Sequence, residues 1–160
     1  MHEEQTIKKP EWTQKAMNAV VRASIYASQN KAEVAELLSK DGKGYLPMPA
    51  PVVKRAMTLY GVDDYVETKA NRHAAEWKNG RIDFQPWPYP SATRFMVDNM
   101  NKTVVGGDKS FLEGLDRDKV ATELVDYKFV KSACDKYPEW MNDPSVNDDD
   151  PYEREEVFAI

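Results

Sequence analysis

The sequence is poor in the side chains that support metal and thiol chemistry: it has one cysteine, Cys134, and two histidines, His2 and His73. A single cysteine excludes a disulfide within the chain but does not identify the redox compartment. Zinc sites need three or four ligands, whereas His73 has only Glu76 beside it at helical spacing. We therefore predict no metal site, no cofactor and no catalytic thiol.

Long apolar runs are also missing. No stretch approaches the roughly 20 apolar residues that span a bilayer, and the opening MHEEQTIKKPEW lacks the apolar segment of a secretory signal. We therefore predict no membrane insertion. If the chain is complete as written, the missing signal predicts a cytoplasmic protein. If it is a mature product or an excised piece, the missing signal says nothing.

The sequence lacks a concentration of positive charge. The net charge is −5, and from Glu139 onward eight carboxylates face one cation, Arg154. That end carries −7 and leaves the first 138 residues at +2, so we predict no nucleic-acid binding, which requires a positive face. We divide the chain into a flexible N-terminus (1–9), a helical module (10–138) and an acidic C-terminal tail (139–160). The tail is expected to lie outside the packed core, because it is acidic and interrupted by prolines.

Helical periodicity dominates the chain, whose 41% of hydrophobic residues suffices for a core. Pro10 suits the first turn of a helix over 10–29, and Asn30 is expected to cap a helix over 31–40. Proline, glycine and polar caps divide the remainder into further helices, expected over residues 51–61, 62–79, 92–102 and 118–134. Asp116 or Asp118 is expected to cap the last of them. The predicted fold class is mainly α: five or six packed helices with at most one short edge strand, over 81–85.

An aromatic and proline-rich corner, QPWPYPSATRF (85–95), is the best candidate for a ligand site. Here two aromatic rings adjoin a helix start that carries hydroxyl groups and one cation, and such helix starts are typical binding sites for small anions. The candidate ligand-binding residues are Trp87, Tyr89, Ser91, Thr93 and Arg94. The interpretation that we favour is structural: Ser91 caps the helix that follows, and the rings fill the space that the prolines leave.

No remaining pattern predicts an enzyme. The run Asn147–Asp150 lacks the alternating spacing and central glycine of a calcium loop, so a solvated acidic segment is favoured over weak cation binding. Gly106 and Gly107 lack the lysine and hydroxyl residue of a phosphate loop, and the sequon at Asn101 is a pattern that is common by chance. No nucleophile has a base beside it in a recognisable local pattern. We predict a non-catalytic protein.

Four segments carry a resemblance to a known family. They are, in order, KPEWTQKAMNAVVRASIYASQNKAEVAELLSK, PAPVVKRAMTLYG, WPYPSATRFMVDNM and LVDYKFVKSAC. They resemble a pair of helices, a helix opened by proline and closed by glycine, an aromatic–proline corner, and a final helix in which an Asp cap precedes an aromatic residue. These features, from about Pro10 to Cys134, resemble the C-terminal region of the nitrate- and bicarbonate-binding proteins of ABC importers, within the nitrate/sulfonate/taurine substrate-binding family.

The resemblance implies a larger assembly than this chain supplies. Complete members are two-lobed α/β proteins more than twice this length, and they capture a small oxyanion in the cleft between the lobes. Most of their ligand contacts lie upstream of the matched region, including a Gly-(Glu or Lys)-Pro-Trp segment that does not occur here. No ligand contact is therefore carried over to a numbered position. By this resemblance the location would be periplasmic.

The expected function is that of a non-catalytic module related to the substrate-binding component of an importer for nitrate, nitrite or bicarbonate, lacking most of the ligand site. Its expected partner is another protein chain, such as the missing lobe, a permease or a larger complex; a small oxyanion is a second candidate partner. The alternative is a structural or accessory subunit that uses the helical scaffold and the acidic tail for protein–protein interaction. Its anchors would be Trp12, Trp77, Trp87 and Trp140.

Overall fold

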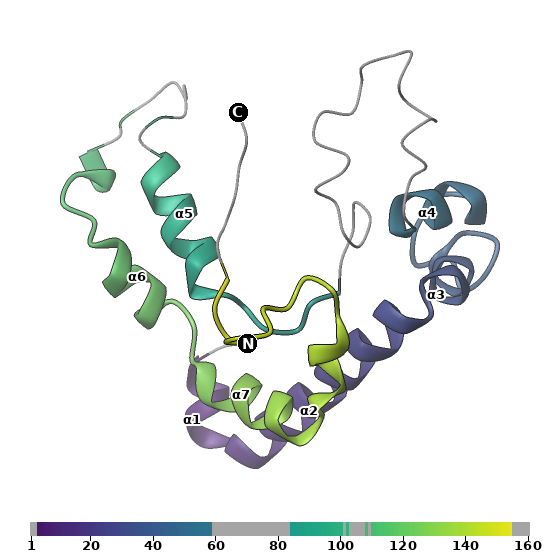
Figure 1. Ribbon diagram of the computed structural model, residues 1–160, viewed down its shortest axis with the longest axis horizontal. Helices are drawn as coiled ribbons and strands as arrows, with labels where there is room; N and C mark the ends of the chain where they lie inside the picture. The colour runs from purple at the N-terminus through teal and green to yellow at the C-terminus, as the bar shows by residue number, and fades with distance from the viewer. Residues whose placement is uncertain (1–2, 59–83, 101, 103–107, 109, 155–160) are drawn as a thin grey trace.

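The computed structural model describes residues 3–58, 84–100, 102, 108 and 110–154. Within these residues it has seven α-helices, two 3-10 helices and no β-strand (Figure 1), which confirms the mainly α fold class. The α-helices are α1 (Glu3–Lys8), α2 (Pro10–Gln29), α3 (Lys31–Leu38), α4 (Ala50–Met57), α5 (Pro90–Met100), α6 (Arg117–Glu123) and α7 (Tyr127–Lys136); the 3-10 helices are η3 (Ser110–Leu112) and η4 (Pro138–Asn142). The predicted helix over 62–79 and most of the predicted strand lie outside the described residues.

The base of the fold is the long helix α2, against which α7 packs. Pro10 starts α2, as predicted, because the first turn of a helix leaves its N–H groups without partners in the helix. Val21 of α2 and Val130 of α7 belong to one buried cluster, and Gln14 Nε2 donates to the carbonyl oxygen of Phe129 at 3.0 Å. In Figure 1 these two helices lie at the bottom, with α3 and α4 on one side and α5 and α6 on the other.

Asn30 joins α2 to α3, but its side chain does not cap α3 as predicted. Its Nδ2 donates to the carbonyl oxygen of Tyr26 at 2.9 Å, and no side-chain hydrogen bond closes the start of α3. The carbonyl groups of the last helical turn lack partners within the helix. Asn30 therefore satisfies the end of α2 rather than the start of α3.

The α3–α4 hairpin has a small core of its own. Its buried members are Ala27, Val34, Ala35, Val53 and Met57. Asp41 Oδ2 accepts from the backbone N–H of Ala50 at 2.8 Å, and this bond closes the start of α4. The hairpin is thus held by apolar packing on one side and by a long-range cap on the other.

The α5–α6 hairpin corrects one predicted cap and confirms another. Helix α5 begins at Pro90, so Ser91 lies in its first turn and not at the cap position before it. At α6 the carboxylate of Asp116 accepts from the N–H groups of Asp118 and Lys119, at 2.9 and 3.1 Å. Asp116, one of the two residues predicted for that role, is therefore the cap.

The single helix predicted over 118–134 is two helices. Asp126 accepts from the backbone N–H of Lys128 at 3.2 Å and starts α7, while α6 has already ended at Glu123. The apolar residues keep their helical spacing across Asp126, so the sequence pattern does not show whether one helix continues there or a second helix begins. This break is one reason why the described residues hold seven α-helices rather than five or six.

Residues 3–8, predicted to be flexible, form the short helix α1. The carbonyl oxygen of Gln5 accepts from the backbone N–H of Lys9 at 2.9 Å and from Thr13 Oγ1 at 3.4 Å. Thr13 is buried, so this polar contact ties α1 to the start of α2.

The prediction that the acidic tail lies outside the core is wrong for residues 140–152. Trp140 is buried in the same cluster as Val21 and Val130, and Val146 and Tyr152 pack against that cluster. The carboxylates of this segment stay at or near the surface. Charge density and core packing coexist here because widely spaced apolar residues turn inward while the acidic residues between them stay in contact with solvent. No helix among the described residues is long and apolar enough to cross a membrane.

Candidate functional site

The aromatic–proline corner lies in the main core. Trp87 and Tyr89 are both buried, in the cluster that also holds Val21, Val130 and Trp140. Prolines on either side of each ring supply no backbone N–H, so residues 86–89 lie outside any helix or sheet, and Pro90 is placed where a proline fits, at the start of α5. Its contribution to the fold is made through side chains.

The last described segment of the chain returns to this corner and binds it. Trp87 Nε1–H donates to the carbonyl oxygen of Tyr152 at 2.9 Å, and the Tyr89 hydroxyl donates to that of Pro151 at 3.3 Å. The rings of Trp87 and Tyr152 meet edge to face with centroids 4.7 Å apart. Both polar atoms of the buried rings therefore have protein partners.

Arg94, the one cation of the candidate set, is held between two carboxylates. Its Nε lies 2.7 Å from Asp118 Oδ1, and one terminal nitrogen lies 3.8 Å from Glu153 Oε2. Two carboxylates beside one guanidinium leave no net positive charge to attract an oxyanion. Thr93 is buried and Ser91 is half-buried in the same turn of α5. The structure thus brings all five candidate residues to one region.

A second cation at this corner was missed by the sequence analysis. The Arg154 guanidinium lies over the Tyr89 ring, 4.2 Å from its centroid, in the geometry of a cation–π contact. Arg154 was visible only as the single basic residue of an acidic segment. Its partner could be found only once that segment was known to fold back onto the corner.

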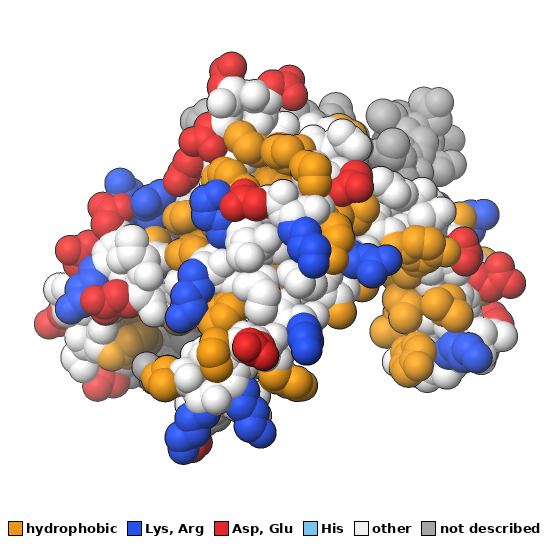
Figure 2. Space-filling view, turned by 90° about the horizontal axis from the view of Figure 1, so that it is seen from below, with side chains coloured by type: hydrophobic (Ala, Val, Ile, Leu, Met, Phe, Trp, Pro, Cys, Tyr) orange, Lys and Arg blue, Asp and Glu red, His pale blue; other side chains and the backbone are white. Residues whose placement is uncertain are grey.

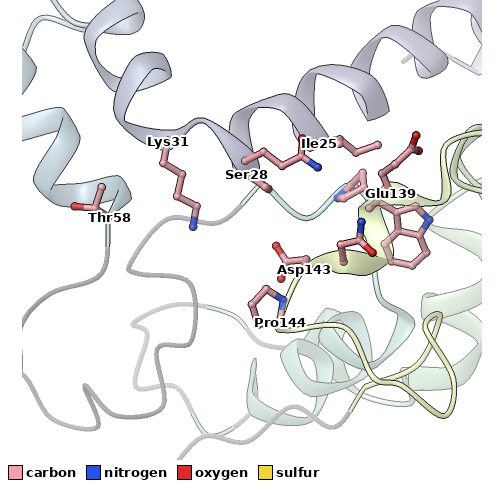
Figure 3. A pocket seen from close by; sticks show the side chains of 11 residues that line it. Ile25, Ser28, Lys31, Thr58, Glu139, Asp143 and Pro144 are labelled. Atoms are coloured by element: carbon pink, nitrogen blue, oxygen red, sulfur yellow. The ribbon is translucent and has the colours of Figure 1, made fainter.

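A cavity of about 320 Å³ lies where the end of α2 meets η4. Its polar lining combines Lys31 with the carboxylates Glu139 and Asp143 and with the hydroxyls of Ser28 and Thr58. Figure 3 shows Lys31 and Asp143 reaching toward the hollow from opposite sides. This volume is at the lower end for small-molecule pockets. Two carboxylates against one cation make it a poor trap for an anion.

Trp140 also lines this cavity, and its ring N–H has no hydrogen-bond partner among the described residues. The same holds for both amide atoms of Gln85, which precedes the cavity-lining Pro86. Buried polar groups without partners cost stability. These two side chains are therefore places where the described fold leaves polar groups unsatisfied.

The thiol of Cys134 is fully buried on α7, and burial, followed by the charge of Asp135, raises its pKa to about 11. Asp135 accepts hydrogen bonds from Tyr152 and Lys131, which lower the pKa of its carboxyl group. Burial, and then the bond to Asp135, raise the pKa of Tyr152. The Cys134 thiol is therefore protonated, and its neighbour Asp135 is paired with Lys131. An activated cysteine nucleophile would instead be a thiolate.

The described residues contain no group of three or more His, Cys, Asp or Glu side chains placed to hold a metal ion. His73 and Glu76 lie outside the described residues, as does the sequon at Asn101. Asp148, Asp149 and Asp150 occupy an exposed turn in which Asn147 Oδ1 accepts from the N–H of Asp149 at 3.0 Å.

Comparison with known proteins adds no family. No family model, no curated protein and no solved structure matches the chain.

Proposed function

We propose that this chain is a non-catalytic helical module related to the substrate-binding component of an oxyanion ABC importer, and that it works by packing against a second protein body. Two features support the proposal: the order of the motifs in the sequence, and the exposed apolar side chains of the α5–α6 hairpin. The hairpin supplies the docking face, and the anion site requires walls that this chain does not supply.

The observation that carries the proposal is the exposure of large apolar side chains on the α5–α6 hairpin. Leu124 is 67% exposed, Phe111 is 65% exposed and Met96 is 55% exposed. The described residues of the hairpin bury little in return: Thr93, Leu112 and Ala121 are the buried ones among them. Several large apolar side chains exposed on one small element favour a role for that element in a protein interface.

The candidate anion residues support a module that does not hold the anion alone. Arg94 is engaged by Asp118 and Glu153, and Trp87 and Tyr89 give their polar atoms to the chain itself. The burial of Trp87 and Trp140 in the core weakens the alternative of an accessory subunit anchored by tryptophans. Trp12, half-exposed on α2, stays available, and Trp77 lies outside the described residues.

Co-expression with the products of the adjoining reading frames tests the docking face. We expect a stable complex with one of them, and we expect Phe111→Ser and Leu124→Ser to weaken that complex by at least about tenfold, since buried apolar contacts dominate such interfaces. Ile7→Ser is the matched control, because Ile7 is equally exposed but lies on α1. A complex that is indifferent to both hairpin substitutions would contradict the assignment of this face.

The anion part of the proposal is tested on the isolated chain. We expect its melting temperature to be the same in millimolar nitrate, nitrite or bicarbonate as in chloride of equal ionic strength, because only a ligand that binds the folded state raises it. A saturable rise with one of these anions would show that the chain holds a complete site.

A further inference from the structure

The α3–α4 hairpin has its own set of exposed apolar side chains, on the opposite side of the fold from α5 and α6. They are Leu37, Tyr45, Leu46, Met48 and Val52. Tyr45 is 72% exposed. Figure 2 shows apolar side chains gathered over this lobe, at the right of the view. We call these five residues the hairpin patch.

The backbone beneath the hairpin patch is well fixed. The N–H of Lys40 donates to the carbonyl oxygen of Met48 at 3.0 Å, and the N–H of Lys43 donates to that of Leu37 at 2.8 Å. These bonds also place the two lysines beside two members of the patch. Gly42 makes the turn possible, because a Cβ there would collide with the carbonyl oxygen of Glu36. A preorganised surface loses little conformational entropy when a partner docks.

Charge distinguishes the hairpin that carries the patch from the C-terminal segment. Residues 31–58 carry five cations against three carboxylates, a net charge of +2. Lys31 and Arg55 have interactions within the chain, so the exposed cations beside the patch are those of Lys40 and Lys43. One of those carboxylates, Asp41, is engaged with the backbone N–H of Ala50. Residues 139–154 carry six carboxylates against one cation, a net charge of −5. The chain therefore has a cationic apolar end and a strongly anionic segment.

The anionic segment is also ordered and available. Asp148, Asp149 and Asp150 are exposed, and none of the ion pairs among the described residues uses them. The turn is fixed at its end, where Asp150 Oδ1 accepts from the N–H of Tyr152 at 3.0 Å. Met141, on the same segment, is exposed as well and offers an apolar group.

We propose that the hairpin patch docks a second copy of this chain, which presents its acidic segment 139–154 to the patch. A two-fold arrangement lets each copy give its patch to the acidic segment of the other, so the contact closes as a dimer and does not extend into a filament. The opposite charges of the two surfaces select this pairing. The α5–α6 face assigned to the second protein body is not used, so the two proposals fail independently.

Sedimentation equilibrium of the purified chain, at low and at high salt, tests the proposal. We expect a monomer–dimer equilibrium that weakens when salt is raised from about 50 mM to about 500 mM, because exposed charge pairs are screened over that range. A chain that stays monomeric at every concentration and salt level overturns the proposal.

Charge reversal makes the test specific. Lys40→Glu with Lys43→Glu, and separately Asp148→Lys with Asp149→Lys and Asp150→Lys, are each expected to weaken the dimer by at least about tenfold. A mixture of the two variants is expected to form a heterodimer as stable as the original dimer, since both of its contacts then pair opposite charges. Two variants that dimerise normally alone, or that fail to combine, contradict the pairing.

Apolar substitutions and lipid complete the controls. Tyr45→Ser is expected to weaken the dimer by about tenfold, while Phe111→Ser, on the other hairpin, is expected to leave it unchanged; circular dichroism confirms that each variant is folded. Loss of the dimer in Phe111→Ser would show that the contact lies on the α5–α6 hairpin and would contradict the proposal. Binding of a monomeric chain to phosphatidylserine vesicles, abolished by the two lysine reversals, would assign the patch to an anionic lipid surface and overturn the proposal.

Discussion

Trp87 donates its indole N–H to the carbonyl oxygen of Tyr152, 65 residues further along the chain, at 2.9 Å. The bond fixes the end of an acidic segment onto a ring that is buried in one cluster with Val21 of α2 and Val130 of α7. The Trp140 and Tyr152 rings also meet, with centroids 5.6 Å apart. The C-terminal segment is therefore one wall of the core, and removing it would open the cluster around Trp87.

Deleting residues 143–160 is expected to destabilise the chain severely. The deletion removes Tyr152 and Val146 from the cluster, exposes the Trp87 ring to water and breaks the hydrogen bond of its N–H, a combination that costs at least about 3 kcal/mol. Urea unfolding, followed by circular dichroism, measures the free energy of unfolding. The control changes Asp148, Asp149 and Asp150 to Asn, which keeps the apolar anchors. A deletion that costs no more than this control would mean that the segment is dispensable.

Two residues at predicted caps are expected to behave differently. Asp116→Ala removes a carboxylate that accepts from two backbone N–H groups at the start of α6, and it should lower the free energy of unfolding by about 1 kcal/mol. Asn30→Ala removes a side chain that does not cap α3, and its cost should be no more than about half as large. Equal losses in urea denaturation would contradict this difference.

The Cys134 thiol is expected to be unreactive in the folded chain. Burial raises its pKa to about 11, so at pH 8 it is almost entirely protonated, and it is covered as well. Alkylation by iodoacetamide should therefore be slow in buffer and become fast in urea. Equal rates in the two conditions would show that the thiol is exposed.

The same raised pKa gives the direction of a pH dependence. The folded state keeps a proton that the unfolded state loses near its ordinary pKa of about 8.5, so this stabilisation is complete below that pH and is lost as the pH rises toward 11. Cys134→Ala should show a flatter decline of melting temperature between pH 8.5 and 11. A parallel decline in both proteins would mean that another group controls this limb.

Local sequence signals predicted the presence of the helices well, and their boundaries and capping residues less well. Pro10, the apolar spacing of α2 and the carboxylate of Asp116 identified element starts that the structure confirms. Asn30 and Ser91 were assigned to caps from residue type alone. Residue type shows that a side chain can cap a helix, but a competing carbonyl of the previous helix, or a proline one position earlier, decides where it goes.

The core was harder to predict because it depends on contacts between distant residues. The sequence predicted that Trp87 and Tyr89 either pack in the fold or contact a ligand. Their hydrogen-bond partners, Tyr152 and Pro151, lie in the acidic segment, which was expected to be outside the core. The net charge of that segment gives no sign of its buried apolar residues, since three or four inward-facing side chains barely change the composition. Likewise, Arg94 could be named as a cation from the sequence, whereas its neutralisation by Asp118 and Glu153 required the packing of α5 against α6.

Residue-resolved hydrogen exchange on the isolated chain is the most direct test of the central claim that the α5–α6 hairpin is completed by a neighbouring protein body. Local opening energies follow the amount of buried apolar packing. The account predicts that amides of α5 and α6 exchange through local opening, at free energies well below those of α2 and α7. Equal protection of the hairpin and of the α2–α7 base would contradict it.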